Sequence, residues 1–317
     1  MSGPEPVGGT GEAVTTGPAT GIVPSPLRAG DLVAVVAPSG PLVGPGLDEG
    51  VALLESWGLR VRVDPSIHDV HHHLAGTDAR RAEELSGALV DDEVRAVWCA
   101  RGGYGLTRIA AEAAAACEVA AEPKWVVGYS DATALHRVVR STRGWVTAHA
   151  IGVCELGRVG PGTDAARSVR DLVFGRVDEV VLAGTVIRDG SATGVVDGGN
   201  LAVLAALCGT PWALGSAGIL VTEDVNERPY ALDRLLTQVL TTSVVGAVAY
   251  GQFTRCEDDR LDRPVATAAQ VVTERSGLVD GPVLADLAVG HIGGRNLAVP
   301  LGAEGRLDGS TLRIALT

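Results

Sequence analysis

The stretch KWVVGYSDATALH (residues 124–136) joins a strand to a helix through one sharp turn. Residues 125–128 form the apolar, β-branched run of a buried strand, and a helix is predicted over residues 132–139. Ser130 lies at the tip of the turn, with the small residues Gly128 and Ala132 two positions away on either side. This pattern approximates the nucleophile elbow G-x-S-x-G, which presents a serine hydroxyl at the carboxyl end of a strand.

A second interpretation of the same residues is that Ser130 only caps the helix, since serine is common at helix N-termini. If Ser130 is a nucleophile, the amide of Asp131 opens the helix and can donate a hydrogen bond to an oxyanion. The five residues alone do not decide between the two interpretations.

Strands and helices alternate along the first 150 residues, which predicts βαβ units and a parallel sheet with its site at the carboxyl ends of the strands. After residue 150 the pattern changes to shorter, Gly- and Val-rich strands mixed with helices. We therefore predict an α/β protein with four parts: a disordered tail (1–27), an N-terminal nucleophile domain (28–155), a linker region (156–190) and a mixed α/β C-terminal domain (191–317).

The loop RGGYG (residues 101–105) follows the third predicted strand and again precedes a helix. Its glycines can bring backbone N–H groups close to a ligand. The loop could cradle a phosphate, could donate to an oxyanion beside the serine, or could be only a tight turn. The spacing lacks the G-x-G-x-x-G and P-loop fingerprints, so the oxyanion interpretation is favoured over the phosphate one.

A serine nucleophile needs a base and an acid that orients it. Among the seven histidines, His291 is the one in a glycine-rich loop after a predicted strand, a placement that suits a catalytic imidazole. The run LVTEDVNE (residues 220–227) ends another strand with three carboxylates, Glu223, Asp224 and Glu227. Composition does not choose among these three acids.

The overall composition excludes several functional classes. The chain has 317 residues and a net charge of −12 without a basic patch, which opposes nucleic-acid binding. No apolar run is long enough to span a membrane. The five cysteines are scattered, which argues against disulfides and a structural zinc and favours a reducing compartment. Residues 1–27 contain eleven Gly or Pro and no signal-peptide core, so we expect a cytoplasmic protein.

Seven stretches together resemble the LD-carboxypeptidases, a serine peptidase family that includes muramoyl-tetrapeptide carboxypeptidases and microcin C self-immunity proteins. They occur in the family's order and extend over about residues 28–305. The stretches are GDLVAVVAPSGP (30–41), LAGTDARRAEEL (74–85), VRAVWCARGGYG (94–105), KWVVGYSDATALH (124–136), GGNLAVLAALCGTP (198–211), LVTEDVNERPYALDRLL (220–236) and VGHIGGRNLAVPLG (289–302).

The resemblance implies a flavodoxin-like N-terminal domain and a smaller C-terminal domain of the swivelling β/β/α type. It implies a catalytic triad of Ser130, Glu223 and His291. The implied oxyanion hole consists of the backbone N–H groups of Gly103 and Asp131. No metal or organic cofactor is implied.

The implied substrate is a murein tetrapeptide in cell-wall recycling, cut at the L,D bond before its terminal D-Ala. Arg101 and Tyr129 are candidate substrate contacts, and Arg228 is a further candidate by charge. The resemblance also implies a homodimer. Two alternative functions stay open: a microcin C-type immunity hydrolase of peptidyl or acyl-sulfamoyl adenylates, and a non-catalytic, flavodoxin-like ligand binder.

Overall fold

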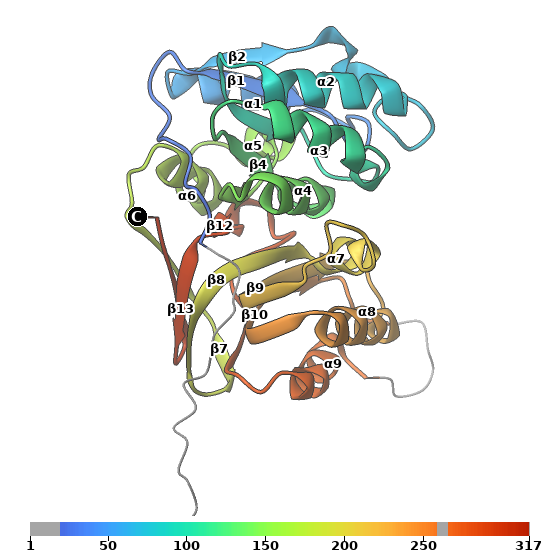
Figure 1. The fold of residues 1–317 in the computed structure, drawn as a ribbon, viewed down its shortest axis with the longest axis vertical. Helices are drawn as coiled ribbons and strands as arrows, with labels where there is room; N and C mark the ends of the chain where they lie inside the picture. The colour runs from blue at the N-terminus through green and yellow to red at the C-terminus, as the bar shows by residue number, and fades with distance from the viewer. Residues whose placement is uncertain (1–19, 259–265, 317) are drawn as a thin grey trace, which may run out of the picture.

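A computed structural model describes residues 20–258 and 266–316 of the chain (Figure 1). Six strands form a first sheet in the order β12-β5-β4-β3-β1-β2, and β1 to β5 are parallel. The order 2-1-3-4-5 is the flavodoxin-like one, so the predicted α/β architecture is confirmed. These strands are β1 (Leu32–Val36), β2 (Arg60–Val63), β3 (Val94–Cys99), β4 (Trp125–Gly128), β5 (Thr147–His149) and β12 (Val299–Leu301).

Helices cover both faces of the first sheet. Successive side chains of each strand point to opposite faces, so each strand packs against both layers of helices. In β1, Val33 and Val35 pack with α1, α5 and α6, whereas Ala34 and Val36 pack with α2, α3 and α4. The helices are α1 (Leu47–Ser56), α2 (Asp78–Val90), α3 (Ala110–Val119), α4 (Thr133–Arg143), α5 (Val153–Val159) and α6 (Asp164–Val173).

The second sheet has the order β6-β14-β13-β8-β9-β10-β11-β7, with β8 to β11 parallel and the outer strands antiparallel. Helices α7, α8 and α9 cover one of its faces (Figure 1), which fits the predicted β/β/α type. The strands are β6 (Glu179–Ala183), β7 (Thr185–Arg188), β8 (Ser191–Asn200), β9 (Ser216–Val225), β10 (Val244–Thr254), β11 (Val283–Ala285), β13 (Glu304–Asp308) and β14 (Thr311–Ala315), and the helices are α7 (Leu201–Leu207), α8 (Pro229–Thr242) and α9 (Ala268–Arg275).

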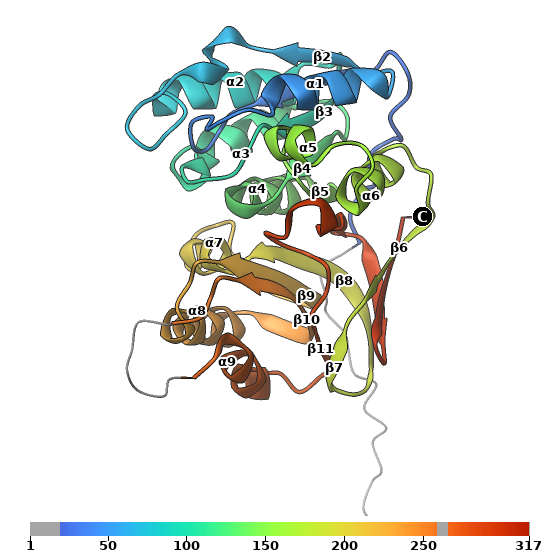
Figure 2. The ribbon, with the colours of Figure 1, turned by 180° about the vertical axis from the view of Figure 1, so that it is seen from behind.

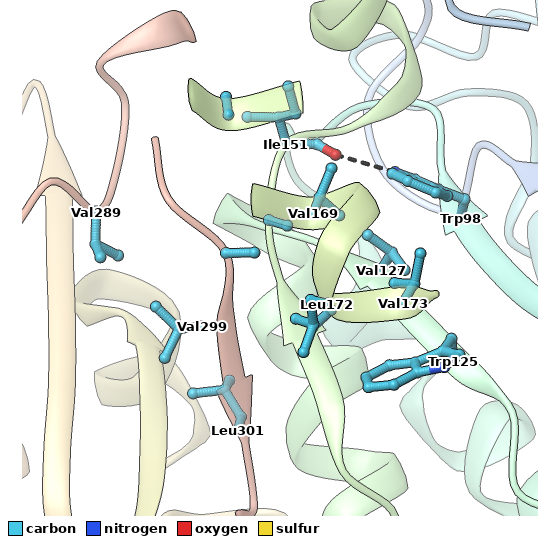
Figure 3. Close-up of a cluster of buried hydrophobic side chains, with 14 of the residues drawn as sticks. Trp98, Trp125, Val127, Ile151, Val169, Leu172, Val173, Val289, Val299 and Leu301 are labelled. Atoms are coloured by element: carbon cyan, nitrogen blue, oxygen red, sulfur yellow. Dashed lines mark hydrogen bonds between the residues drawn. The ribbon is translucent and has the colours of Figure 1, made fainter. Parts of the chain in front are cut away.

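The C-terminal segment ties the two sheets together. After β11 the chain runs beside α5 and α6 (Figure 2) and then adds β12 to the edge of the first sheet, antiparallel to β5. Val299 and Leu301 of β12 join an apolar cluster that includes Val169 and Leu172 of α6 (Figure 3). One continuous core therefore connects the sheet that carries the predicted nucleophile to the chain that follows the predicted base.

A buried ionic contact links α4 to β8 at the same junction. Asp197 of β8 is 2% exposed and pairs with Arg137 and Arg140 of α4. The Thr133 hydroxyl also accepts a hydrogen bond of 2.9 Å from the Asn200 amide. Because buried charges are costly when unpaired, this contact fixes how the two parts sit against each other.

The structure bears on the predicted tail and linker. Residues 1–19 lie outside the described residues, but residues 20–27 are held in place, because Leu27 is buried and its amide bonds to the Val173 carbonyl at 2.8 Å. The tail prediction is therefore wrong for residues 20–27. The predicted linker region, 156–190, contains α6 and two strands of the second sheet, β6 and β7. The division into domains stays a prediction.

Candidate active site

The turn after β4 has the geometry of a nucleophile elbow. Ser130 has a φ of +60°, a left-handed conformation that costs a residue other than glycine roughly 1–3 kcal/mol. Gly128 is needed for the tight turn, because a Cβ atom there would lie 2.7 Å from the Ala132 Cβ. Ser130 does not cap α4, whose N-cap is Ala132; it begins a short 3-10 turn over Ser130–Ala132. The capping interpretation therefore has no support in the structure.

The glycine-rich loop after β3 lies directly against the elbow. A Cβ atom on Gly102 would be 2.7 Å from the Ser130 Cβ and 2.9 Å from its Oγ. Gly103 has a φ of +130° and approaches Gly40 of the loop after β1 so closely that a Cβ atom would be 2.8 Å from the Gly40 nitrogen. Within the described residues, the Gly103 amide makes no hydrogen bond. The loop therefore passes directly beside the serine hydroxyl at Gly102.

The side chain of Asp131 fastens three loops at the carboxyl edge of the first sheet. Its Oδ2 accepts hydrogen bonds from the Ser39 hydroxyl at 2.7 Å and from the Leu106 amide at 2.9 Å. Burial raises the pKa of this carboxyl, and the two hydrogen bonds oppose the rise. Asp131 is 2% exposed, so its backbone amide is held rigidly at the elbow.

Glu223 and His291 meet at the carboxyl edge of the second sheet. His291 Nδ1 lies 2.8 Å from Glu223 Oε2, and Glu223 is fully buried near the end of β9. Gly290, with a φ of +120°, passes so close that a Cβ atom would be 2.9 Å from the same carboxylate oxygen. The Gly290 amide is itself held by the Asn296 side chain at 2.9 Å. Glycine before the histidine therefore lets the imidazole reach the buried acid.

The environment of His291 changes its basicity. Burial lowers its pKa, but the hydrogen bond and charge of Glu223, with the charges of Glu155 and Asp224, outweigh burial. The net pKa of His291 therefore lies above its ordinary value of 6.5. The Glu223 carboxylate also fixes which ring nitrogen faces outward, because it accepts the Nδ1 proton. Nε2 is left for a partner on the open side.

The neighbouring acid Asp224 has a different set of contacts. Its carboxylate accepts hydrogen bonds from the Ala202 amide at 2.8 Å and from the Asn200 side chain at 3.0 Å, which fastens the start of α7. Burial raises its pKa to about 6. The same Asn200 nitrogen also lies 3.4 Å from Glu223 Oε1, so the two carboxylates are neighbours, and it is Glu223 that contacts His291.

Two other histidines lie behind the site and are buried. His149 Nε2 is 3.9 Å from Glu223 Oε1, and His136 Nε2 contacts the Gly128 carbonyl at 2.9 Å. Burial lowers the pKa of His136 to about 4 and that of His149 well below its ordinary value, so both are neutral at pH 7. Neither can exchange protons with bulk solvent as readily as His291.

A cavity of about 270 Å³ contains the predicted nucleophile and the predicted base together. The elbow and the glycine-rich loop form one part of its wall, and helix α5 forms another. It is lined by Val43, Ala100, Arg101, Gly102, Gly103, Tyr129, Ser130, Gly152, Cys154, Glu155, Arg158 and His291.

The candidate substrate contacts are placed differently with respect to this cavity. Arg101 lines it, and its guanidinium donates to the Pro41 carbonyl at 2.8 Å and to the Gly102 carbonyl at 3.2 Å. Tyr129 also lines it, and its ring centre is 4.8 Å from that of His291. Arg228 is not among the lining residues and lies 4.0 Å from Asp258.

Two charged lining residues, Glu155 and Arg158, were missed by the sequence analysis. Glu155 accepts a short hydrogen bond from the Tyr129 hydroxyl. Both residues are on α5, three positions apart, and therefore share one face of that helix. A glutamate and an arginine with this spacing, directly after a strand of the parallel sheet, are a sequence signal that could have indicated both residues as part of the site.

Family models cover most of the chain. Residues 33–150 match the LD-carboxypeptidase N-terminal domain, and residues 193–307 match the LD-carboxypeptidase C-terminal domain. No helix in the described part of the chain is long and apolar enough to cross a membrane.

Relatives match over nearly the whole length. A candidate carboxypeptidase of Streptomyces coelicolor is 40% identical and is covered over 95% of its length by 92% of this chain. The murein tetrapeptide carboxypeptidase of Pseudomonas aeruginosa is 30% identical, with 89% of this chain and 94% of the relative covered.

Solved structures share the fold. The microcin C7 self-immunity protein superposes with a TM-score of 0.79 at 20% identity, over 93% of this chain and 98% of its own. The muramoyltetrapeptide carboxypeptidase of Oxalobacter formigenes superposes with a TM-score of 0.76 at 23% identity, over 90% of this chain and 98% of its own. Together with the two family models and the full-length relatives, these matches show that the chain is an enzyme that belongs to the LD-carboxypeptidase family.

Proposed function

We propose that this enzyme is a serine carboxypeptidase that removes the terminal D-Ala of murein tetrapeptides during cell-wall recycling. The observation that carries the proposal is the Glu223–His291 pair, 2.8 Å apart, beside a cavity that also contains Ser130 at the tip of a strained elbow. Full-length relatives named as murein peptide carboxypeptidases supply the substrate class.

In the proposed mechanism Ser130 attacks the carbonyl carbon of the L,D bond. His291 takes the hydroxyl proton on Nε2 and later gives it to the leaving amine of D-Ala. Glu223 holds the imidazole by Nδ1 and stabilises the positive charge that the ring acquires. Water then attacks the acyl-enzyme with His291 again as the base, which releases the shortened peptide.

The oxyanion that forms in each step is stabilised by the amides of Gly103 and Asp131. The Gly103 amide is free within the described residues, and the Asp131 amide is held in place by that residue's own buried side chain. Removing one donor of this kind costs about 3 kcal/mol in other hydrolases, or about a hundredfold in rate.

The two candidate substrate contacts have distinct roles in this proposal. The Tyr129 ring packs beside His291 and forms the wall against which the leaving residue lies. Arg101 keeps the oxyanion loop in shape through the Pro41 and Gly102 carbonyls and presents its remaining N–H groups to the cavity.

The proposal includes a homodimer in the cytoplasm. It is supported by the family resemblance and by the five free cysteines, four of them buried, which suit a reducing compartment. Light scattering of the purified chain and fractionation of cells that produce it test the two parts separately.

Two measurements test the activity. Mass spectrometry of muropeptides incubated with the protein should show conversion of tetrapeptide to tripeptide, and an aminoacyl sulfamoyl adenosine serves as the competing substrate. A serine-reactive fluorophosphonate should label the wild type and not Ser130→Ala. Labelling without tetrapeptide cleavage would support a serine hydrolase but contradict the murein tetrapeptide as its substrate. The absence of both labelling and cleavage would contradict the proposed mechanism.

A further inference from the structure

We infer that Arg158 is the residue that binds a carboxylate of the substrate in the cavity beside Ser130. The inference rests on the proposed carboxypeptidase function and adds a specificity-determining residue to it. A peptidase that removes a terminal residue has to recognise a carboxylate, and the tetrapeptide offers two near the cleaved bond: the terminal one and, where the third residue is diaminopimelate, the one on its side chain.

The charges of the cavity favour an anionic group at this place. Its lining residues include two arginines, Arg101 and Arg158, and one acid, Glu155. The acids Glu223 and Asp224 act on His291, so the positive charge available to an anion is on the arginine side of the cavity, in a chain that carries −12 as a whole.

Arg158 is the arginine of the cavity with its guanidinium uncommitted. Two nitrogens of Arg101 donate to the backbone carbonyls of Pro41 and Gly102. Glu155, which could have paired with Arg158 along the helix, accepts instead from Tyr129. Over residues 20–258 and 266–316, Arg158 has no ion pair within 4.0 Å and no side-chain hydrogen bond. A planar guanidinium in this state offers a bidentate site for a carboxylate.

The position of Arg158 is fixed by unusually close helix packing. A Cβ atom on Gly157 would be 2.1 Å from the Gly46 carbonyl oxygen, and one on Gly50 would be 2.1 Å from the Val153 carbonyl oxygen. Helices α1 and α5 therefore touch through their backbones, and the Arg158 stem lies against Gly46. This packing holds the base of the side chain still at the rim of the cavity, which reduces the entropy lost when the carboxylate binds.

The test compares three peptides: one ending in L-Lys-D-Ala, its C-terminal amide, and one ending in diaminopimelate-D-Ala. Their dissociation constants are measured by calorimetry on Ser130→Ala, with and without Arg158→Gln, and kcat/KM is measured in the active chain. We expect R158Q to weaken binding of the free-carboxylate peptides about 10- to 100-fold. Arg167→Gln, on an exposed surface pair with Asp164, is the matched control and should change nothing.

The pattern of losses identifies which carboxylate is bound. If R158Q weakens binding of both free-acid peptides but not of the amide, Arg158 binds the terminal carboxylate. Loss only with the diaminopimelate peptide assigns it to the side-chain carboxylate. An equal loss with all three, no loss, or no binding of any peptide would overturn the inference. If the peptides bind in an Arg158-dependent manner but are not cleaved by the wild type, the proposed function fails and this inference stands.

Discussion

Gly102 sets the position of the nucleophile, so Gly102→Ala should disable the enzyme without unfolding it. The new methyl carbon would lie 2.7 Å from the Ser130 Cβ, whereas carbon atoms in contact are about 3.5–4.0 Å apart. Something must move by roughly 1 Å, and a displacement of that size at a reacting centre costs about a hundredfold in rate, or about 2.7 kcal/mol. The φ of Gly102 is not in the left-handed region, so alanine is otherwise acceptable there.

The assay is kcat for release of D-Ala from a tetrapeptide, together with the rate of fluorophosphonate labelling and the melting temperature. Gly162→Ala is the control, because a Cβ atom on Gly162 meets nothing within 4 Å. We expect kcat and labelling to fall about a hundredfold in G102A and to be unchanged in G162A, with both melting temperatures close to that of the wild type. A G102A enzyme with a normal melting temperature and activity within threefold of the wild type would refute the reasoning.

Three further predictions follow from the site and the junction. The acidic limb of the kcat/KM profile should have its midpoint above pH 6.5, because His291 must be neutral to act as the base and its pKa is raised; a midpoint at or below 6.5 contradicts this. Glu223→Gln should lower kcat by about 10³- to 10⁴-fold and shift the acidic limb of the kcat/KM profile to lower pH, because the charge that raises the pKa of His291 is gone. An unshifted acidic limb would contradict the coupling between Glu223 and His291. Asp197→Ala should lower the free energy of unfolding, measured in urea, by about 3–5 kcal/mol, because it leaves Arg137 buried without its carboxylate partner. Asp308→Ala, which removes an exposed ion pair with Arg306, is the control and should cost under about 1 kcal/mol. Equal losses in the two variants would show that the Arg137–Asp197 ion pair does not stabilise the fold.

The local sequence determines the elements of the site and their order. A buried strand, one small–x–Ser–x–small turn and a helix within residues 125–139 predict an elbow, because a tight turn at a strand end depends on neighbouring residues alone. The alternation of strands and helices likewise predicts the parallel sheet. The seven collinear stretches identify the family, and with it the expectation for Glu223 and His291.

The limits of the sequence are clear at the three acids and at the tail. Glu223, Asp224 and Glu227 have similar chemistry within five residues, and composition cannot say which one faces a loop 68 residues further along. Residues 20–27 have the composition of a disordered segment, but hydrogen bonds to the distant residues Val173 and Gly302 hold them in place. Contacts of this kind are set by partners far away in the chain, which a local pattern does not contain.

The sequence by itself therefore determined that a serine stands at a strand end and that an acid and a histidine follow in a second domain. Only the tertiary structure decided that His291 lies 2.8 Å from Glu223, that the Asp224 carboxylate fastens the start of α7, and that Arg158 lines the same cavity as Ser130 without an ion pair among the described residues. The physical reason is that strand and turn formation depend on neighbouring residues, whereas these contacts depend on tertiary packing: the loop after β11 lies against the end of β9, the start of α7 lies beside β9, and glycine contacts join α1 to α5.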